Sequence, residues 1–155
     1  MGLDMYLFGK RYVSKYFNKG DDERAEAIKK LFPELEEMTS SLSESPVKEV
    51  KIEAGYWRKA NQVHKWFVDN VQSGSDDCGD YSVQREKLEE LKKLCQQVLD
   101  FRHLATDKLP PQTGFFFGND AIDEYYFQDI EHTIKIIDRC LALPESWEFE
   151  YHSSW

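Results

Sequence analysis

The sequence has 155 residues, of which 41% are hydrophobic, 32% charged and 14% aromatic, a composition typical of a folded globular protein. This length suits one domain, predicted to span residues 1–155, and the many aromatic residues exclude a disordered tail protein. No apolar run approaches the roughly 20 residues that span a bilayer, and the N-terminus lacks the basic and apolar regions of a signal peptide. We therefore expect no membrane association and a cytoplasmic location.

The formal net charge is −9, and it is unevenly distributed along the chain. Residues 105–155 hold ten Asp or Glu against three Lys or Arg, a net charge of −7. An acidic region of this size repels phosphate backbones, which argues against nucleic acid as a partner. The three cysteines are widely spaced and odd in number, so they match neither a disulfide framework nor a CxxC metal or redox motif.

Apolar and polar residues alternate in some segments and follow helical spacing in others. In chain order, these patterns predict a strand at 3–9, a helix at 22–32, a strand at 47–54, helices at 56–72 and 82–104, a short strand or extended segment at 114–118, a helix at 120–143 and a strand at 147–153. Strands at the beginning, middle and end, with about four helices between them, predict an α+β domain. In it, a small and mainly antiparallel sheet would be packed by helices on one face.

The segment GYWRKANQVHKWFVDNVQ, residues 55–72, is central to this structural prediction. It has no proline, and its apolar residues recur at spacings of three and four, which predicts a helix. Asn61 and His64 interrupt the apolar stripe, and leaving them buried without partners would cost about 1 to 3 kcal/mol each. The remaining face is expected to be solvated; it carries Arg58, Lys59, Gln62, Lys65 and Asp69.

Two interpretations satisfy the polar groups of this segment. In the first, Asn61 and His64 belong to a structural network that fixes how the helix docks on its neighbours. In the second, a cleft binds a small anionic or polar molecule through convergent polar groups, with Trp57 or Tyr126 stacking on it. The candidate ligand-binding residues of the second interpretation are Trp57, Arg58, Asn61, His64 and Tyr126.

A second informative stretch is GFFFGNDAIDEYYFQD, which begins at residue 114 and places three Phe beside several carboxylates. One interpretation is a buried segment followed by a helix whose acidic first turn favours the positive end of the helix dipole. The other is an exposed aromatic and acidic patch that contacts a partner, because Tyr and Phe are enriched in interface cores. The candidate partner-binding residues are Phe115, Phe116, Phe117, Asp123, Glu124 and Tyr125.

Metal, cofactor and hydrolytic motifs find little support. No two of the four histidines have the spacing of a zinc motif, and the sequence has no GxSxG and no phosphate-binding glycine loop. We therefore expect no metal and no cofactor. A small hydrolase-type enzyme would have to pair His64 with Asp123 or Glu124 within hydrogen-bond reach.

Four segments together resemble a small family of proteins from bacteriophages, prophages and bacterial genomes: MGLDMYL, YWRKANQVHKWFV, GFFFG followed by DEYYFQDI, and YHSSW. The resemblance covers most of the chain, and its central motif is the most specific. It implies no established reaction, ligand or catalytic residue, but it does imply a context, that of an accessory protein acting on host or phage processes.

The leading hypothesis is therefore a non-enzymatic accessory protein of phage or prophage type in the host-cell cytoplasm. It would bind another protein, such as a host defence component, through its acidic and aromatic C-terminal third. The first alternative is a small-ligand, nucleotide-like binding protein that uses Arg58, Asn61 and His64. The second alternative is the hydrolase-type enzyme.

Overall fold

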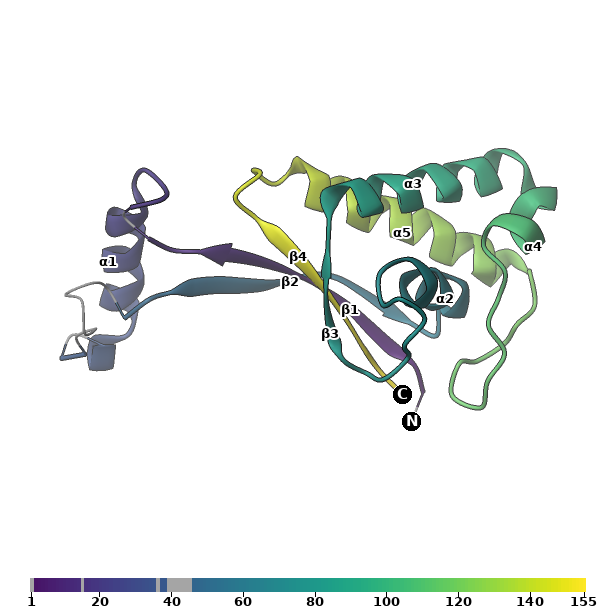
Figure 1. Ribbon diagram of the computed structural model, residues 1–155, viewed down its shortest axis with the longest axis horizontal. Coiled ribbons are helices and arrows are strands. Elements are labelled where there is room, and N and C mark those ends of the chain that lie inside the picture. The colour runs from purple at the N-terminus through teal and green to yellow at the C-terminus, as the bar shows by residue number, and fades with distance from the viewer. Residues whose placement is uncertain (1, 15, 36, 39–45) are drawn as a thin grey trace. The chain divides into compact units, whose positions relative to one another are not determined.

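The computed structural model describes residues 2–14, 16–35, 37–38 and 46–155. Its elements are β1 (Asp4–Tyr12), α1 (Asp21–Leu31), η1 (Pro33–Leu35), β2 (Glu49–Arg58), α2 (Asn61–Asn70), β3 (Asp80–Val83), α3 (Arg85–Asp100), η2 (Arg102–Leu104), α4 (Ala105–Lys108), α5 (Glu124–Ala142) and β4 (Glu148–Ser154). Figure 1 shows these elements in sequence colours. No helix in the described part of the chain has both the length and the apolar character needed to cross a bilayer.

The described residues form two compact units, one of Met1–Gly9 with Ile52–Trp155 and one of Lys10–Lys51. The sequence by itself predicts one domain. The strands form one antiparallel sheet in the order β2-β1-β4-β3. Strand β3 pairs with β4 from Asp80 opposite His152 to Val83 opposite Phe149.

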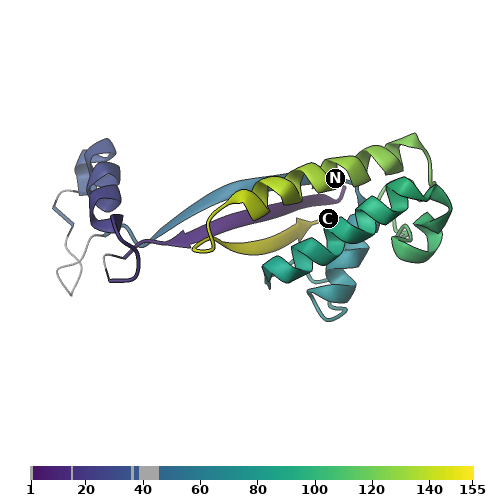
Figure 2. The same ribbon diagram turned by 90° about the horizontal axis from the view of Figure 1, so that it is seen from above.

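The core of the first unit lies between one face of the sheet and the helices. Strand β1 alternates as its sequence predicts, so Met5 and Leu7 are buried while Tyr6 is half-buried on the opposite face. Helices α3 and α5 lie side by side in both ribbon views (Figures 1 and 2) and share this core with α2. The backbone of β2 approaches α5 closely, because a Cβ added at Gly55 would lie 2.3 Å from the Ile136 side chain.

The predicted α+β class, with a small antiparallel sheet packed by helices, is confirmed, and most predicted elements overlap observed ones. The predicted helix at 56–72 is partly wrong, because β2 continues to Arg58 and α2 begins only at Asn61. Buried Gly55 and Trp57 alternate with exposed Tyr56, which is the period of a strand. Lys59, with φ of +59°, then redirects the chain into the helix.

Two further elements differ from the expectation. Residues 115–117 form a turn and no strand, although the Leu3 amide donates to the Phe116 carbonyl at 2.9 Å beside the sheet. Strand β3 occupies residues 80–83, where the sequence predicts the end of a loop and the start of a helix. A four-residue strand with little alternation gives almost no periodic signal, and pairing with β4 decides its conformation.

The second unit is organised around the first residue of α1. Asp21 is buried and accepts hydrogen bonds from the Ser14 amide at 3.1 Å, from Arg11 at 2.8 Å and from Arg24 at 2.9 Å. Burial opposes the negative charge, but these donors outweigh it and lower the pKa of Asp21 to about 2. The Val13 amide also bonds to the Lys48 carbonyl at 2.8 Å, which joins the two strand ends within this unit.

Candidate functional site

Asn61, at the start of α2, bonds to the segment that precedes α5. Its Nδ2 donates to the carbonyls of Phe117, at 3.1 Å, and Asn119, at 2.8 Å. Its Oδ1 accepts from the Gln112 amide at 3.0 Å. The amide therefore uses both its donors and its acceptor inside the protein, and it fixes the connection between α4 and α5 against α2.

His64 lies one turn further along α2 and is fully buried. Its Nδ1 lies 2.8 Å from the hydroxyl of Tyr151, and its Nε2 lies 3.1 Å from Oδ2 of Asp76. A carboxylate only accepts, so the neutral ring donates from Nε2 to Asp76 and accepts at Nδ1 from Tyr151. Burial lowers the pKa of His64, although the hydrogen bond to Asp76 raises it in part. Trp155 extends this chain, donating from Nε1 to Asp76 Oδ1 at 3.0 Å.

The pairing of His64 with Asp123 or Glu124 does not form. Asp123 instead caps α5, accepting the Tyr126 amide at Oδ1 over 3.1 Å, and exposed Glu124 pairs with Arg102 at 3.2 Å. Both nitrogens of His64 are already occupied by Tyr151 and Asp76. The geometry required for the hydrolase-type hypothesis is therefore absent at the residues that the sequence suggested.

The other candidate ligand-binding residues differ in their surroundings. Trp57 is buried and donates from Nε1 to Thr133 Oγ1 at 2.9 Å, while the Tyr126 hydroxyl donates to the Leu109 carbonyl at 2.8 Å. Arg58 is largely exposed and reaches Asp4 at 3.4 Å. The polar groups of Trp57, Asn61, His64 and Tyr126 thus have partners within the chain, which favours the structural-network interpretation.

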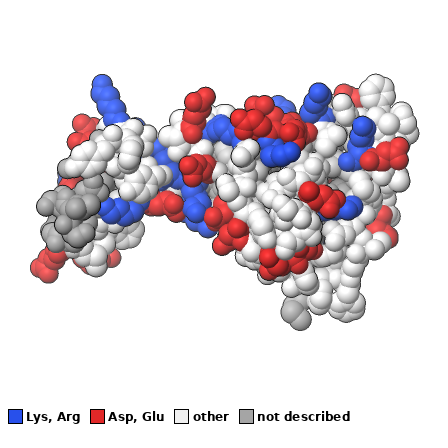
Figure 3. All heavy atoms as spheres, in the orientation of Figure 1, with Lys and Arg blue, Asp and Glu red and all other residues white. Residues whose placement is uncertain are grey.

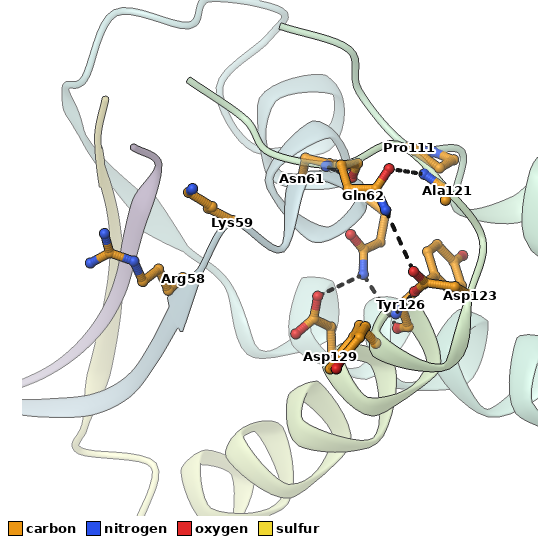
Figure 4. A pocket seen from close by; sticks show the side chains of 11 residues that line it. Arg58, Lys59, Asn61, Gln62, Pro111, Ala121, Asp123, Tyr126 and Asp129 are labelled. Atoms are coloured by element: carbon orange, nitrogen blue, oxygen red, sulfur yellow. Dashed lines mark hydrogen bonds between the residues drawn. The ribbon is translucent and has the colours of Figure 1, made fainter. Parts of the chain in front are cut away.

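A pocket nevertheless opens beside Asn61, with a cavity volume of about 300 Å³. It lies between the end of β2, the start of α2, the loop before α5 and the first turns of α5 (Figure 4). Its lining consists of Arg58, Lys59, Asn61, Gln62, Pro111, Asn119, Ala121, Asp123, Tyr125, Tyr126 and Asp129. The pocket therefore combines residues from both stretches that the sequence analysis singled out.

The polar groups of this pocket are mostly amides and carboxylates. Gln62 Nε2 lies 3.4 Å from Oδ2 of Asp129 and 3.4 Å from the Tyr126 carbonyl, and Asn119 Nδ2 lies 3.5 Å from Oδ2 of Asp123. Burial raises the pKa of Asp129, an effect that the hydrogen bond from Gln62 only partly offsets. The expectation of a solvated Gln62 is wrong, because its side chain is buried under the loop and α5.

The segment at 114–118, which we call the aromatic turn, presents its three Phe differently. Phe115 is 95% exposed, whereas Phe117 is 8% exposed and packs its ring 5.3 Å from that of His64. Phe116 is half-buried and stacks on Trp155 with ring centres 6.1 Å apart. Tyr125, at the start of α5, is 76% exposed. Of the three consecutive Phe, only Phe115 is fully available to a partner.

Sequence reasoning missed several residues that build these sites. Asp76 and Trp155 belong to the His64 network, and Gln62, Asn119 and Asp129 belong to the pocket. The alternating tail WEFEYHSSW does predict that Tyr151 points inward, but no local signal predicts which helix residue it meets. No group of three or more His, Cys, Asp or Glu side chains suited to a metal ion occurs in the part of the chain that the structure describes.

Comparison of the chain with protein-family models, with curated proteins and with solved structures finds no match. The resemblance to phage and prophage proteins, which depends on the four motifs, therefore stays a prediction.

Proposed function

We propose that the protein is a non-enzymatic binding protein that recognises a protein partner through the aromatic turn. The observation that carries this proposal is the 95% exposure of Phe115. An exposed Phe side chain leaves unused roughly 1.5 to 3 kcal/mol of burial free energy, which a partner's apolar pocket would recover. Large aromatic side chains seated in such pockets dominate the binding energy of many interfaces.

The aromatic turn is held in place before any partner arrives. The Phe117 amide donates to the Gly114 carbonyl at 3.1 Å, Leu3 donates to the Phe116 carbonyl, and Asn61 donates to the Phe117 carbonyl. A preorganised turn loses little conformational entropy on binding, so most of the burial energy of Phe115 becomes affinity. This arrangement favours recognition over a purely structural role, because a side chain needed only for packing would be buried.

Charge supports a surface role for the same region. In the space-filling view, Lys, Arg, Asp and Glu crowd the surface over α3, whereas the loop between α4 and α5, at the lower right, is mostly uncharged (Figure 3). Interface cores are depleted in charged residues relative to the rest of a surface. The resemblance to phage and prophage proteins suggests a host protein in the bacterial cytoplasm, such as a defence component, as the partner.

The nucleotide-like alternative at Arg58, Asn61 and His64 has weaker support. Asn61 already bonds to the carbonyls of Phe117 and Asn119. His64 already bonds to Tyr151 and Asp76. Arg58 alone offers a single exposed cation that already reaches Asp4. An anionic ligand would also meet the carboxylates of the neighbouring pocket.

The proposal can be tested by placing a photo-crosslinking residue at the tip of the turn. Phe115→p-benzoylphenylalanine, expressed in a bacterial host and irradiated, is expected to give one discrete crosslinked product. The matched control is Phe101, which is 56% exposed in the same unit and should give none. Similar products from both positions would contradict the proposal.

The purified partner then allows a quantitative test. Phe115→Ala should weaken its binding by roughly tenfold to a hundredfold, whereas Phe101→Ala should leave it unchanged. Because Phe115 is exposed, its replacement should alter the free energy of unfolding by less than about 0.5 kcal/mol. Unchanged affinity of Phe115→Ala would show that the turn is not the binding surface.

A further inference from the structure

We infer that the pocket beside the aromatic turn is a binding site for a guanidinium group, whose planar set of donors matches acceptors on Gln62, Asp129 and Asp123. Its ligand is thus a cation, whereas the sequence suggests a small anionic or polar molecule for Arg58, Asn61 and His64. This site does not depend on the aromatic turn being a partner surface, and it can be tested separately.

Gln62 presents an open acceptor, its Oε1, at the cavity. Gln62 is only 3% exposed, and its Nε2 is engaged by Asp129 and the Tyr126 carbonyl. Among the described residues no donor reaches its Oε1, and Figure 4 shows the amide lying in the cavity beside Asp129. This oxygen is accessible from the cavity, so a donor supplied from outside the chain can reach it and form a hydrogen bond there.

The Asp129 carboxylate also favours a cationic ligand. The hydrogen bond that the structure shows for Asp129 comes from Gln62 at 3.4 Å, which is long for a charged acceptor. Burial raises the pKa of Asp129, the hydrogen bond from Gln62 and the nearby His132 oppose this rise, and Asp123 adds to it. No Lys or Arg in the described part of the chain forms an ion pair with the Asp129 carboxylate. A ligand that brings a cation would restore the ionised form to its ordinary stability.

The cations on the rim do not fill this role. In Figure 4 the side chains of Arg58 and Lys59 extend away from Asp123 and Asp129. Arg58 pairs with Asp4, and no ion pair within the described ranges joins either cation to the two carboxylates. The stem of Lys59 packs against Gly118, where an added Cβ would lie 3.2 Å from it.

Shape and chemistry favour a guanidinium over a bare metal ion or a simple ammonium. A guanidinium has five donors in one plane, which can engage an amide oxygen and a carboxylate together. Tyr125 and Tyr126 line the same pocket, and aromatic rings stack well on guanidinium planes. About 300 Å³ holds the group and its alkyl chain, at the lower end of ligand-pocket sizes.

The experiment titrates isotope-labelled protein with N-acetyl-arginine amide and follows the side-chain amide signals of Gln62 and Asn119 by NMR. N-acetyl-citrulline amide, which has nearly the same shape but no charge, is the control ligand. We expect the arginine compound alone to shift the Gln62 signals. Equal shifts by the citrulline compound, or none by the arginine compound, would overturn the inference.

Variants of matched charge locate the site. Asp129→Asn keeps the shape of the side chain and should weaken binding roughly tenfold to a hundredfold, the effect expected for a charged hydrogen bond. Glu131→Gln removes the same charge from an exposed position of the same helix and should have no effect. Should Asp129→Asn fail to fold, Asp123→Asn retains a good N-cap and should weaken binding likewise. If Asp129→Asn and Asp123→Asn both bound N-acetyl-arginine amide as tightly as wild type, the inference would be overturned.

Two further ligands identify the source of the guanidinium. Agmatine represents a free small molecule, and an arginine-containing peptide from the crosslinked partner represents a protein side chain. Tighter binding of the peptide, weakened by Phe115→Ala, joins the pocket to the partner surface. Binding of agmatine and capped arginine with no effect of Phe115→Ala supports the pocket as a site for a free small molecule, and the function of the turn is then decided by the partner affinity of Phe115→Ala alone.

Discussion

Helix α2 contributes buried polar side chains to two regions, which differ in how completely these side chains are hydrogen-bonded within the chain. In the His64 network, the imidazole, the Tyr151 hydroxyl, the Asp76 carboxylate and the Trp155 indole bond to one another in series. In the pocket, Gln62 is just as deeply buried, yet its Oε1 has no donor within the described chain. Buried polarity alone therefore does not mark a binding site. What distinguishes the pocket from the network is an acceptor that a ligand entering the cavity could reach.

The largest expected effect comes from breaking the closed network. His64→Ala would leave the Tyr151 hydroxyl and Asp76 without their partner and create a cavity beneath Phe117. We expect the free energy of unfolding to fall by about 3 to 5 kcal/mol, measured by urea denaturation. His103→Ala, at an exposed position, should change it by less than about 0.5 kcal/mol. A small effect at His64 would mean that its bonds contribute little to the fold.

An intermediate effect on stability is expected at Asp21 in the second unit, a carboxylate that, unlike Asp129, has close hydrogen-bond donors within the chain. Asp21→Asn should lower stability at neutral pH by about 1 to 3 kcal/mol, because Arg11, Arg24 and the Ser14 amide lose a charged acceptor. The folded pKa of about 2 lies below the ordinary value of 3.8. The stabilisation of the folded state by the ionised Asp21 carboxylate is therefore present above pH 3.8 and is lost as the pH falls through 2. Denaturation curves of wild type and variant should converge over that interval.

The smallest expected effect on stability, with the opposite pH dependence, is at Asp129. Its folded pKa is raised by burial, so the ionised carboxylate disfavours the folded state. Relative to Asp129→Asn, wild-type protein should gain stability as the pH falls through that raised value. At neutral pH the variant should be as stable as wild type, or more stable by up to about 1 kcal/mol. A clear loss of stability in Asp129→Asn would show that the carboxylate is structural, like Asp21.

The sequence was sufficient for the α+β class and for most element positions, because alternation in β1 and β4 and helical spacing in α3 and α5 are strong local signals. It was insufficient around residues 55–60. Trp57, Asn61 and His64 fit helical spacing, yet Gly55 and Trp57 also fit a strand, and pairing with β1 decides between the two. Overlapping strand and helix periodicities cannot be separated without knowing which strand the segment pairs with.

The candidate site was predictable only in part, for a related reason. Asn61 and His64 were correctly singled out as polar groups in an apolar stripe, but their roles depend on the distant residues Phe117, Asp76 and Tyr151. The sequence pattern predicts Gln62 on the solvated face, because nothing near it in the sequence indicates the loop that covers it. Helical spacing predicts which residues share a face, but it does not predict what lies on that face.

The position of β1 and β4 as neighbours in the sheet affects how the chain folds during synthesis. Most of the sequence separates the two strands, so their pairing carries a large loop-closure entropy and forms slowly. A ribosome will have released β1, with its row of large apolar side chains, well before β4 emerges to cover its edge. Nascent chains of this protein are therefore expected to rely on chaperones and to aggregate when translation pauses ahead of residue 148.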